Sequence, residues 1–455
     1  MVLEKRQEGL MTEGPILKQL LAFAMPLLLG NLFQQLYNAV DSAVVGHYVG
    51  DGALAAVGSS ASLINMIVSL FMGVAVGGSV IISQYYGARD NQGLHDAIHT
   101  VLAFSGVAGV LITIVGALAS PMILQFMDTP EEVMPLSVLY LRIIFLGALP
   151  MVFYNMGSGL LRALGDSKRP LYFLILASLL NIVLDILFVA SFGMGVAGAA
   201  LATVLAQMVS AVLIMAVMVR TEEAYKVTLG EIRFHWDKLR AIIRIGLPSG
   251  IQGAIVSFSN VLVQSNINFF GETVMAGCSA YIKIDGFVVL PVMSMSMTLT
   301  TFVGQNIGAL EHERVKKGTR LGVALGVGIT LALTLLLQVG GVLLLRIFSE
   351  DETVIGYGLQ MMRVLSIGYC LLAISHCLAG AVRGVGLTRA PMVIMVLCWC
   401  VARVLWIVFI GRRLESLPLV LAGYPVTWAM SAALFLLYIW KVDWIHYYER
   451  KLKAA

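Results

Sequence analysis

The residues of this chain that could do chemistry are acids set in otherwise apolar stretches. Asp185 is the only formal charge between Leu171 and Phe192, and Asn181 precedes it by four residues. On a helix, residues four apart lie on the same face, one turn above the other. A carboxylate inside a bilayer is costly unless a cation, a proton or polar partners satisfy it. The pair therefore predicts a polar site within a membrane-spanning helix.

The composition indicates the kind of protein that must position these acids. Of the 455 residues, 59% are hydrophobic and 12% are charged, whereas a soluble domain has about 25% charged residues. Apolar runs of 20 or more residues recur, and each could cross a bilayer core of roughly 30 Å as a helix. The composition excludes a set of soluble domains and predicts a polytopic membrane protein.

We expect an all-α membrane protein with twelve transmembrane helices in two six-helix bundles. The longest polar segment between them runs from about Arg220 to Arg240. The predicted domains are an N-terminal lobe (1–220, helices 1–6), a cytoplasmic linker (221–240) and a C-terminal lobe (241–455, helices 7–12). The predicted spans are residues 16–45, 52–83, 95–119, 136–160, 171–192, 196–219, 241–270, 275–303, 320–346, 357–381, 391–411 and 417–440.

The charges in the loops predict the orientation. Lys and Arg concentrate in the loops that follow even-numbered helices. The loops that follow odd-numbered helices hold a cluster of acids: Asp128, Glu131, Glu132, Glu350, Asp351 and Glu352. By the positive-inside rule, the basic side is cytoplasmic and both termini lie there. The last odd-numbered loop, with Arg412 and Arg413, departs from the trend. Met1–Gly14 is charged and has no apolar signal region, so we expect no cleaved leader.

The two halves of the chain repeat. GSGLLRALGDSKRP at 157–170 matches LAGAVRGVGLTRAP at 378–391, and SQYYGA ending at Ala88 matches GQNIGA ending at Ala309. Each match has an offset of 221 residues, while Pro26 matches Pro248 at 222. Because each repeat holds an even number of helices, both insert in the same orientation. We expect them to be related by a pseudo-two-fold axis along the membrane normal.

Helices 1, 5 and 6 can bring the acids together. Helices 1 and 5 run in the same direction, and Asp41 and Asp185 fall in the outer part of each. Thr203 on helix 6 lies at comparable depth. Two carboxylates, an amide and a hydroxyl would form a hard oxygen cage suited to Na⁺. Alternatively, the close carboxylates would hold a proton, or the acids would make structural hydrogen bonds only.

The repeat distinguishes scaffold from function. The second half has Trp406 where the first has Asp185, Ala402 where it has Asn181, and Val263 where it has Asp41. Since the second half keeps the matched glycines and prolines without these acids, the fold does not require the carboxylates.

Other polar side chains predict a substrate cavity. Gln34 with Asn38 and Gln264 with Asn268 are both i,i+4 pairs; they could line a cavity or join helices by hydrogen bonds. Met293 could belong to a soft, adaptable wall or to plain packing. Asp285 is added as the acid within a second-half span, near Lys283, and Arg403 could be a buried tie to the other half. Pro26 predicts a kink in helix 1, which makes it a candidate hinge.

The sequence resembles the multidrug and toxic compound extrusion (MATE) family over residues 12–440. The resemblance rests on the 6+6 repeat, the Pro26–Asp41 stretch, Asn181 with Asp185, and the paired ISQYYGA and VGQNIGA segments. It is closest to prokaryotic members with the cation site in the N-terminal half. It implies that helix 1 bends near Pro26 and that the cation site is formed by Asp41, Asn181, Asp185, Thr203 and the Ala199 carbonyl.

The expected function is secondary active efflux of organic cationic or amphipathic compounds in antiport with Na⁺ or H⁺. No GK[ST] phosphate loop is present, so ATP hydrolysis is not indicated. A flippase for a lipid-linked or amphiphilic metabolite is the alternative. An enzyme is not expected, since His376 is the only His clearly within a span. We expect a monomer in a bacterial cytoplasmic membrane, with no cofactor beyond the coupling ion and no nucleic-acid partner.

Overall fold

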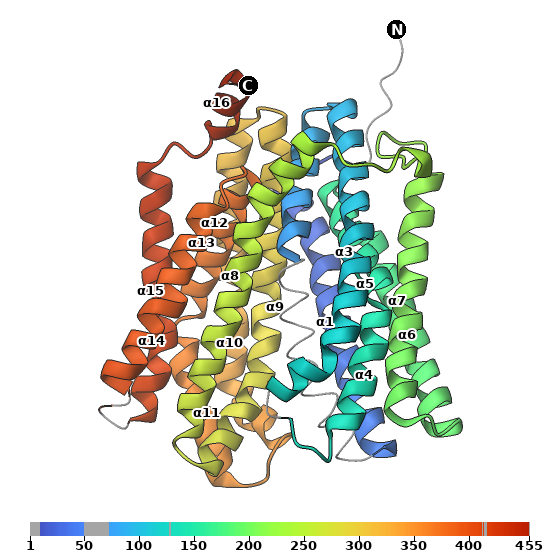
Figure 1. The fold of residues 1–455 in the computed structure, drawn as a ribbon. Coiled ribbons are helices and arrows are strands. Elements are labelled where there is room, and N and C mark those ends of the chain that lie inside the picture. Colours follow the sequence, from blue (N-terminus) through green and yellow to red (C-terminus); the bar gives the residue numbers. More distant parts are fainter. Residues whose placement is uncertain (1–9, 50–71, 127–128, 412, 414–415, 455) are drawn as a thin grey trace. The chain divides into compact units, whose positions relative to one another are not determined.

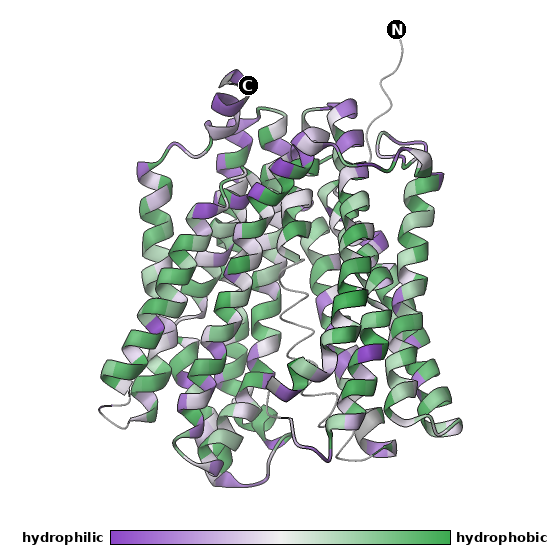
Figure 2. Ribbon diagram, in the orientation of Figure 1, coloured by the Kyte–Doolittle hydropathy of each residue, from purple (hydrophilic) through white to green (hydrophobic). Residues whose placement is uncertain are grey.

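The chain is built from helices. The computed structural model describes residues 10–49, 72–126, 129–411, 413 and 416–454 (Figure 1). Within these ranges every regular element is a helix, which confirms the predicted all-α class. Figure 2 shows hydrophobic residues along the lengths of the helices and hydrophilic ones near helix ends and in the connections.

The helices of the first repeat include one short π-helix, η1, and one 3₁₀ turn, η2. They are α1 (Ile16–Tyr48), a helical segment over residues 72–87, α3 (Asn91–Phe126), α4 (Met134–Leu146), α5 (Ala148–Ala163), α6 (Lys168–Asp185), η1 (Ile186–Ser191), α7 (Gly195–Arg220) and η2 (Leu229–Glu231).

The second repeat has the same order, with two π-helical segments, η3 and η4, and a short C-terminal helix. Its elements are α8 (Trp236–Asn268), α9 (Glu272–Gly308), α10 (His312–Arg346), α11 (Glu352–Ser366), α12 (Tyr369–Gly384), α13 (Arg389–Val396), η3 (Leu397–Ala402), α14 (Arg403–Trp406), η4 (Ile407–Gly411), α15 (Leu417–Lys441) and α16 (Tyr447–Ala454).

Nine helices of the described residues are long and apolar enough to cross a membrane, and eleven if each bent pair counts as one span. The bent pairs are α4 with α5, at 53°, and α11 with α12, at 51°. The predicted second span lies largely outside the described residues, and its described end, 72–87, is helical. The helix predicted from residue 241 begins earlier, at Trp236, within the predicted linker.

The repeat extends to backbone geometry. Gly147 and Gly368 each occupy the bend of a bent pair. Gly165 and Gly386 end α5 and α12 with φ of 87° and 97°, a left-handed conformation that glycine adopts at little cost. The two glycines of each pair are 221 residues apart, as the match between the repeats in the sequence requires.

The chain forms two compact units whose boundaries lie inside two helices. Leu29–Leu247 belong to one unit, called the first unit here, and Met11–Leu28 with Pro248–Ala455 form the second. α1 therefore passes from one unit to the other just after Pro26, and α8 does so at Pro248. The predicted lobes, 1–220 and 241–455, and the bending of α1 at Pro26 stay predictions.

Candidate cation site

Three helices of the first unit bring the predicted site residues together. Asp41 lies in the C-terminal part of α1, Asp185 is the last residue of α6, and Thr203 lies on α7, which packs along α6. The carboxyl groups of Asp41 and Asp185 lie close enough to interact with each other. A hydrogen bond between them would require a proton on one of the two groups, because ionised carboxylates are acceptors only.

Asn181 holds Asp185 in place. With the amide oriented so that both its ends are satisfied, the Asn181 nitrogen donates to Asp185 Oδ2 at 2.8 Å. Its oxygen then accepts from the Thr203 backbone N–H at 3.1 Å. Asn181 and Asp185 are both fully buried. The i,i+4 spacing that placed them on one face therefore gives direct contact, and the amide also joins α6 to α7.

Two oxygens of the acid pair have no donor. Asp41 Oδ1 and Asp185 Oδ1 are buried and make no hydrogen bond in the structure. A buried acceptor without a partner costs about 1–3 kcal/mol, and more when it is charged. Because the surrounding polar atoms include carboxylate, amide and hydroxyl oxygens, the site fits a hard cation such as Na⁺ or a shared proton.

An apolar cluster surrounds this polar group. Tyr140 and Ile144 of α4 pack with Val189 of η1 and with Val196 and Ala199 of α7. These side chains are at most 7% exposed, so they exclude water and strengthen electrostatic interactions nearby. Ala199 lies one turn before Thr203, but coordination by its carbonyl stays a prediction.

Tyr37 is a polar neighbour that sequence reasoning missed. Its hydroxyl lies 3.3 Å from Thr203 Oγ1. The signal was available, because Tyr37 precedes Asp41 by four residues and so shares its helix face. Tyr140 also lies close enough to interact electrostatically with Asp41 and Asp185. Nothing in the sequence points to it, since α4 carries no acid near that position.

The π-helix that follows Asp185 belongs to the scaffold. η1 begins at Ile186, and η4 begins at its repeat partner Ile407 in the unit without the acids. Although π-helical turns are frequent at functional sites, this one is not specific to the cation site.

The predicted cavity residues belong to two units, so each group is described separately. In the first unit, Gln34 Nε2 donates to Asn38 Oδ1 at 3.2 Å. In the second, Gln264 Nε2 donates to Asn268 Oδ1 at 2.9 Å. Each pair is bonded along its own helix, with the Asn exposed and the Gln half-buried, and Met293 is 39% exposed. A cavity shared by these residues stays a prediction.

The charges of the second unit have partners of their own. Asp285 accepts from the Tyr369 hydroxyl, and Tyr369 and Tyr281 share a hydrogen bond at 2.5 Å. Lys283, two residues away, instead lies 5.3 Å from the centre of the Phe348 ring. The two charges therefore face different neighbours, as their spacing predicts.

Arg403 is a buried tie, but its partners lie within the second unit and not in the other half as predicted. Its guanidinium donates to Thr427 Oγ1 at 3.0 and 3.2 Å and to Asn260 Oδ1 at 3.5 Å. It also lies 4.4 Å from the centre of the Tyr424 ring. Arg403 is 2% exposed, so it is not presented to an anionic head group as the flippase alternative would require.

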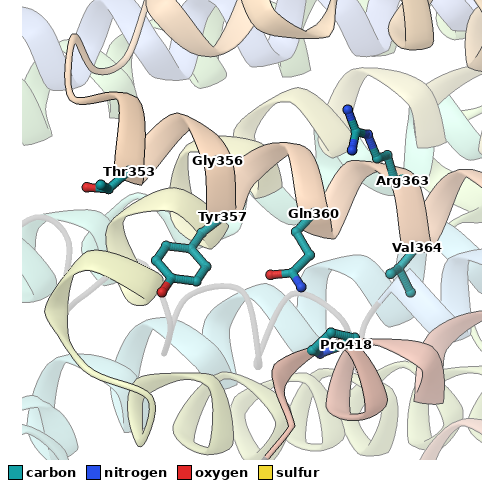
Figure 3. A pocket seen from close by; sticks show the side chains of 7 residues that line it. All are labelled: Thr353, Gly356, Tyr357, Gln360, Arg363, Val364 and Pro418. Atoms are coloured by element: carbon teal, nitrogen blue, oxygen red, sulfur yellow. The ribbon is translucent and has the colours of Figure 1, made fainter.

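A pocket of about 550 Å³ lies against α11 (Figure 3). In Figure 3, Tyr357 and Gln360 lie on the side of α11 toward Pro418, and Arg363 points away from it. Thr353, Gly356 and Val364 complete the lining. None of the predicted site residues contributes to it, so this pocket does not mark the cation site.

Comparison with known proteins identifies the family to which the chain belongs. The family model described as MatE matches residues 26–187 and 248–408, which correspond to the two repeats. The chain belongs to the MatE family. A probable multidrug resistance protein of Bacillus subtilis, YpnP, is 31% identical over 86% of this chain and 88% of its own length.

Other known proteins are similar to this chain over most of their length. A probable multidrug resistance protein NorM of Thermotoga maritima is 28% identical over 83% of this chain and 82% of its own length. A solved MATE structure in the bent conformation superposes with a TM-score of 0.90 at 26% identity, covering 99% of this chain and 100% of that one. As a MatE member, the chain is a multi-pass membrane transporter and not an enzyme, as predicted.

Proposed function

We propose that this protein exports organic cationic or amphipathic compounds in antiport with Na⁺ or H⁺ by alternating access. The coupling ion binds at Asp41 and Asp185, with Thr203 and Asn181 beside them. The observation that carries this proposal is the buried acid pair, in which each carboxylate keeps one oxygen without a donor. The names of the MatE relatives support multidrug compounds as the cargo.

The acid pair supplies a reason for coupling. With no cation, two negative charges in a dry cluster repel each other, and a proton or Na⁺ between them removes that repulsion. A state that exposes the pair to water and a state that buries it therefore differ in stability according to whether the ion is bound. An ion with such differential affinity shifts the balance between the two states. In this proposal both termini are cytoplasmic.

The test is efflux of a fluorescent organic cation from proteoliposomes. A Na⁺ gradient at constant pH and a pH gradient without Na⁺ are imposed in separate runs. Asp41→Asn and Asp185→Asn are expected to reduce gradient-driven efflux to the level of empty liposomes, because each removes a negative charge while conserving side-chain shape. Glu132→Gln, at an exposed position outside the acid pair, is the matched control and should pump normally.

The two gradients also identify the ion, since the coupled one drives efflux by itself. Normal pumping by both Asn variants, with wild-type ion dependence, would overturn the assignment of the site. Loss of efflux in Glu132→Gln as well would show that the assay responds to any lost charge.

A further inference from the structure

A second cluster of titratable side chains lies where the linker meets the first turns of α3. His95 and His99 belong to α3, and Glu231 ends the short 3₁₀ helix η2. One nitrogen of each imidazole and one Glu231 oxygen all lie within 4.8 Å of one another. His95 Nε2 is 2.9 Å from Glu231 Oε2. All three residues belong to the first unit, and the transport proposal uses none of them.

The two histidines share one helix face. They are four residues apart, and their ring centres are 3.9 Å apart with the planes inclined by 30°. Two imidazoles at this spacing can present nitrogens to one metal ion, as they do in helical zinc sites. Stacking of two histidines gains little by itself, and it would be unfavourable if both rings carried a proton charge.

His99 is held in the form that binds metals. Its Nδ1 lies 2.8 Å from the His95 carbonyl oxygen and must donate to it. Its Nε2 accepts from the Thr228 backbone N–H at 3.2 Å, so this nitrogen carries the lone pair. A backbone carbonyl on the other ring nitrogen is the usual support of a metal-binding histidine. A metal ion at this nitrogen would replace the Thr228 contact, and ligation by His95 and Glu231 would replace their direct contact.

Acidic groups near the cluster favour a cation. Asp96 Oδ1 lies 3.7 Å from His95 Nδ1, and Asp96 Oδ2 lies 3.7 Å from His235 Nδ1. With Glu231, two carboxylates face three imidazoles. Arg233 is turned toward His235, with Nε 3.5 Å from His235 Nε2. A divalent ion would place positive charge between the carboxylates and the imidazole rings.

We propose that His95, His99 and Glu231 bind a divalent transition-metal ion, represented by Zn²⁺. Two imidazole nitrogens and one carboxylate oxygen suit this borderline cation, with water as a fourth ligand. Because Glu231 lies on the linker and the histidines on α3, the ion clips the linker to α3 within the first unit. In the absence of metal, the backbone bonds from Thr228 to His99 and from His235 to Thr100 Oγ1 hold the same junction.

Zn²⁺ binding is measured on the purified full-length protein after treatment with a chelator, by competition with a chromophoric Zn²⁺ indicator. We expect one equivalent for the wild type. His95→Ala and Glu231→Gln should each weaken binding at least about tenfold; His99 is fully buried and is left intact to avoid misfolding. His446→Ala is the matched control, since His446 also contacts a carboxylate, Asp443 Oδ1 at 2.7 Å, and it should bind normally.

A second measurement follows the linker itself. Trypsin can cut after the exposed Arg233, two residues from Glu231. Zn²⁺ at 100 times its Kd should slow this cleavage by about 100-fold if cleavage requires release of the clip, and His95→Ala should abolish the protection. Equal Zn²⁺ affinity in the wild type and His95→Ala would overturn the proposal, as would cleavage that does not respond to Zn²⁺. Both measurements are independent of transport.

Discussion

The two units place opposite charges on the same repeated helix. In the first unit, α6 carries Asp185, which meets Asp41 and leaves two oxygens without donors. In the second, the matching segment carries Arg403, one residue after the partner of Asn181, and neutral side chains hold its guanidinium. The cation of the second unit is part of the chain and cannot leave. In the proposed function, the negative charge of the first unit is instead neutralised by an ion from solution.

The difference separates what the repeat needs from what one copy does. Gly147 and Gly368 at the bends, and Gly165 and Gly386 at the helix ends, serve both units alike. The buried charges, in contrast, differ between the units: the first has Asp41 and Asp185, and the second has Arg403. Substitutions at repeat-related positions should therefore have similar structural effects, whereas substitutions near the charges should affect stability in one unit and ion dependence in the other.

The largest effect on stability is expected for Thr427→Val. The substitution conserves shape but removes the oxygen that accepts two N–H groups of the buried Arg403. Donors on a buried charge that lose their acceptor cost about 2 kcal/mol. The melting temperature of the purified protein should fall, while the ion dependence of efflux in proteoliposomes stays as in the wild type.

Thr203→Val is the counterpart in the first unit. It removes a hydroxyl whose contact is neutral, to Tyr37 at 3.3 Å, so the melting temperature should change little. The cation concentration for half-maximal efflux should rise on the order of tenfold, equivalent to about 1.4 kcal/mol. If Thr203→Val lowered stability as much as Thr427→Val and left ion dependence unchanged, the contrast between the two units would be lost.

Substitution of the bend glycines should affect stability in both units. A Cβ at Gly368 would lie 2.8 Å from the Pro425 backbone and 2.6 Å from Trp428, whereas one at Gly147 would meet the Val204 side chain at 2.3 Å. Overpacking costs about 1–3 kcal/mol. Gly368→Ala should lower the melting temperature more than Gly147→Ala, because the backbone of α15 cannot rotate away as a side chain can.

Gly340→Ala is the control for these variants. A Cβ there meets nothing within 4 Å, and Gly340 lies inside α10, where Ala is favoured over Gly by about 0.5–1 kcal/mol. It should raise the melting temperature slightly. Equal tolerance of Ala at residues 147, 340 and 368 would show that the bends do not depend on close approach.

Much of this contrast could be predicted from the sequence. Length and hydropathy gave the helical class and most spans, because a helix that crosses lipid must be long and apolar. The i,i+4 rule predicted the contact between Asn181 and Asp185. Tyr140 could not be predicted, since its place depends on how α4 packs against α1 and α7. The unit boundaries inside α1 and α8 cannot be read from hydropathy either, because hydropathy does not report which neighbours a helix contacts.

The smallest effect concerns two residues in a left-handed conformation. Arg89 and Leu310, which are repeat partners, end their helices with φ of 55° and 60°. Each allows the next N–H to bond back, from Asp90 to Tyr85 O at 3.1 Å and from Glu311 to Asn306 O at 2.8 Å. This conformation costs a residue with a side chain about 1 kcal/mol, and glycine adopts it freely.

Leu310→Gly should therefore raise the melting temperature slightly. Arg89→Gly should gain less, because Arg89 makes further interactions. A lower melting temperature for Leu310→Gly would mean that its side chain contributes more by packing than its backbone loses by strain.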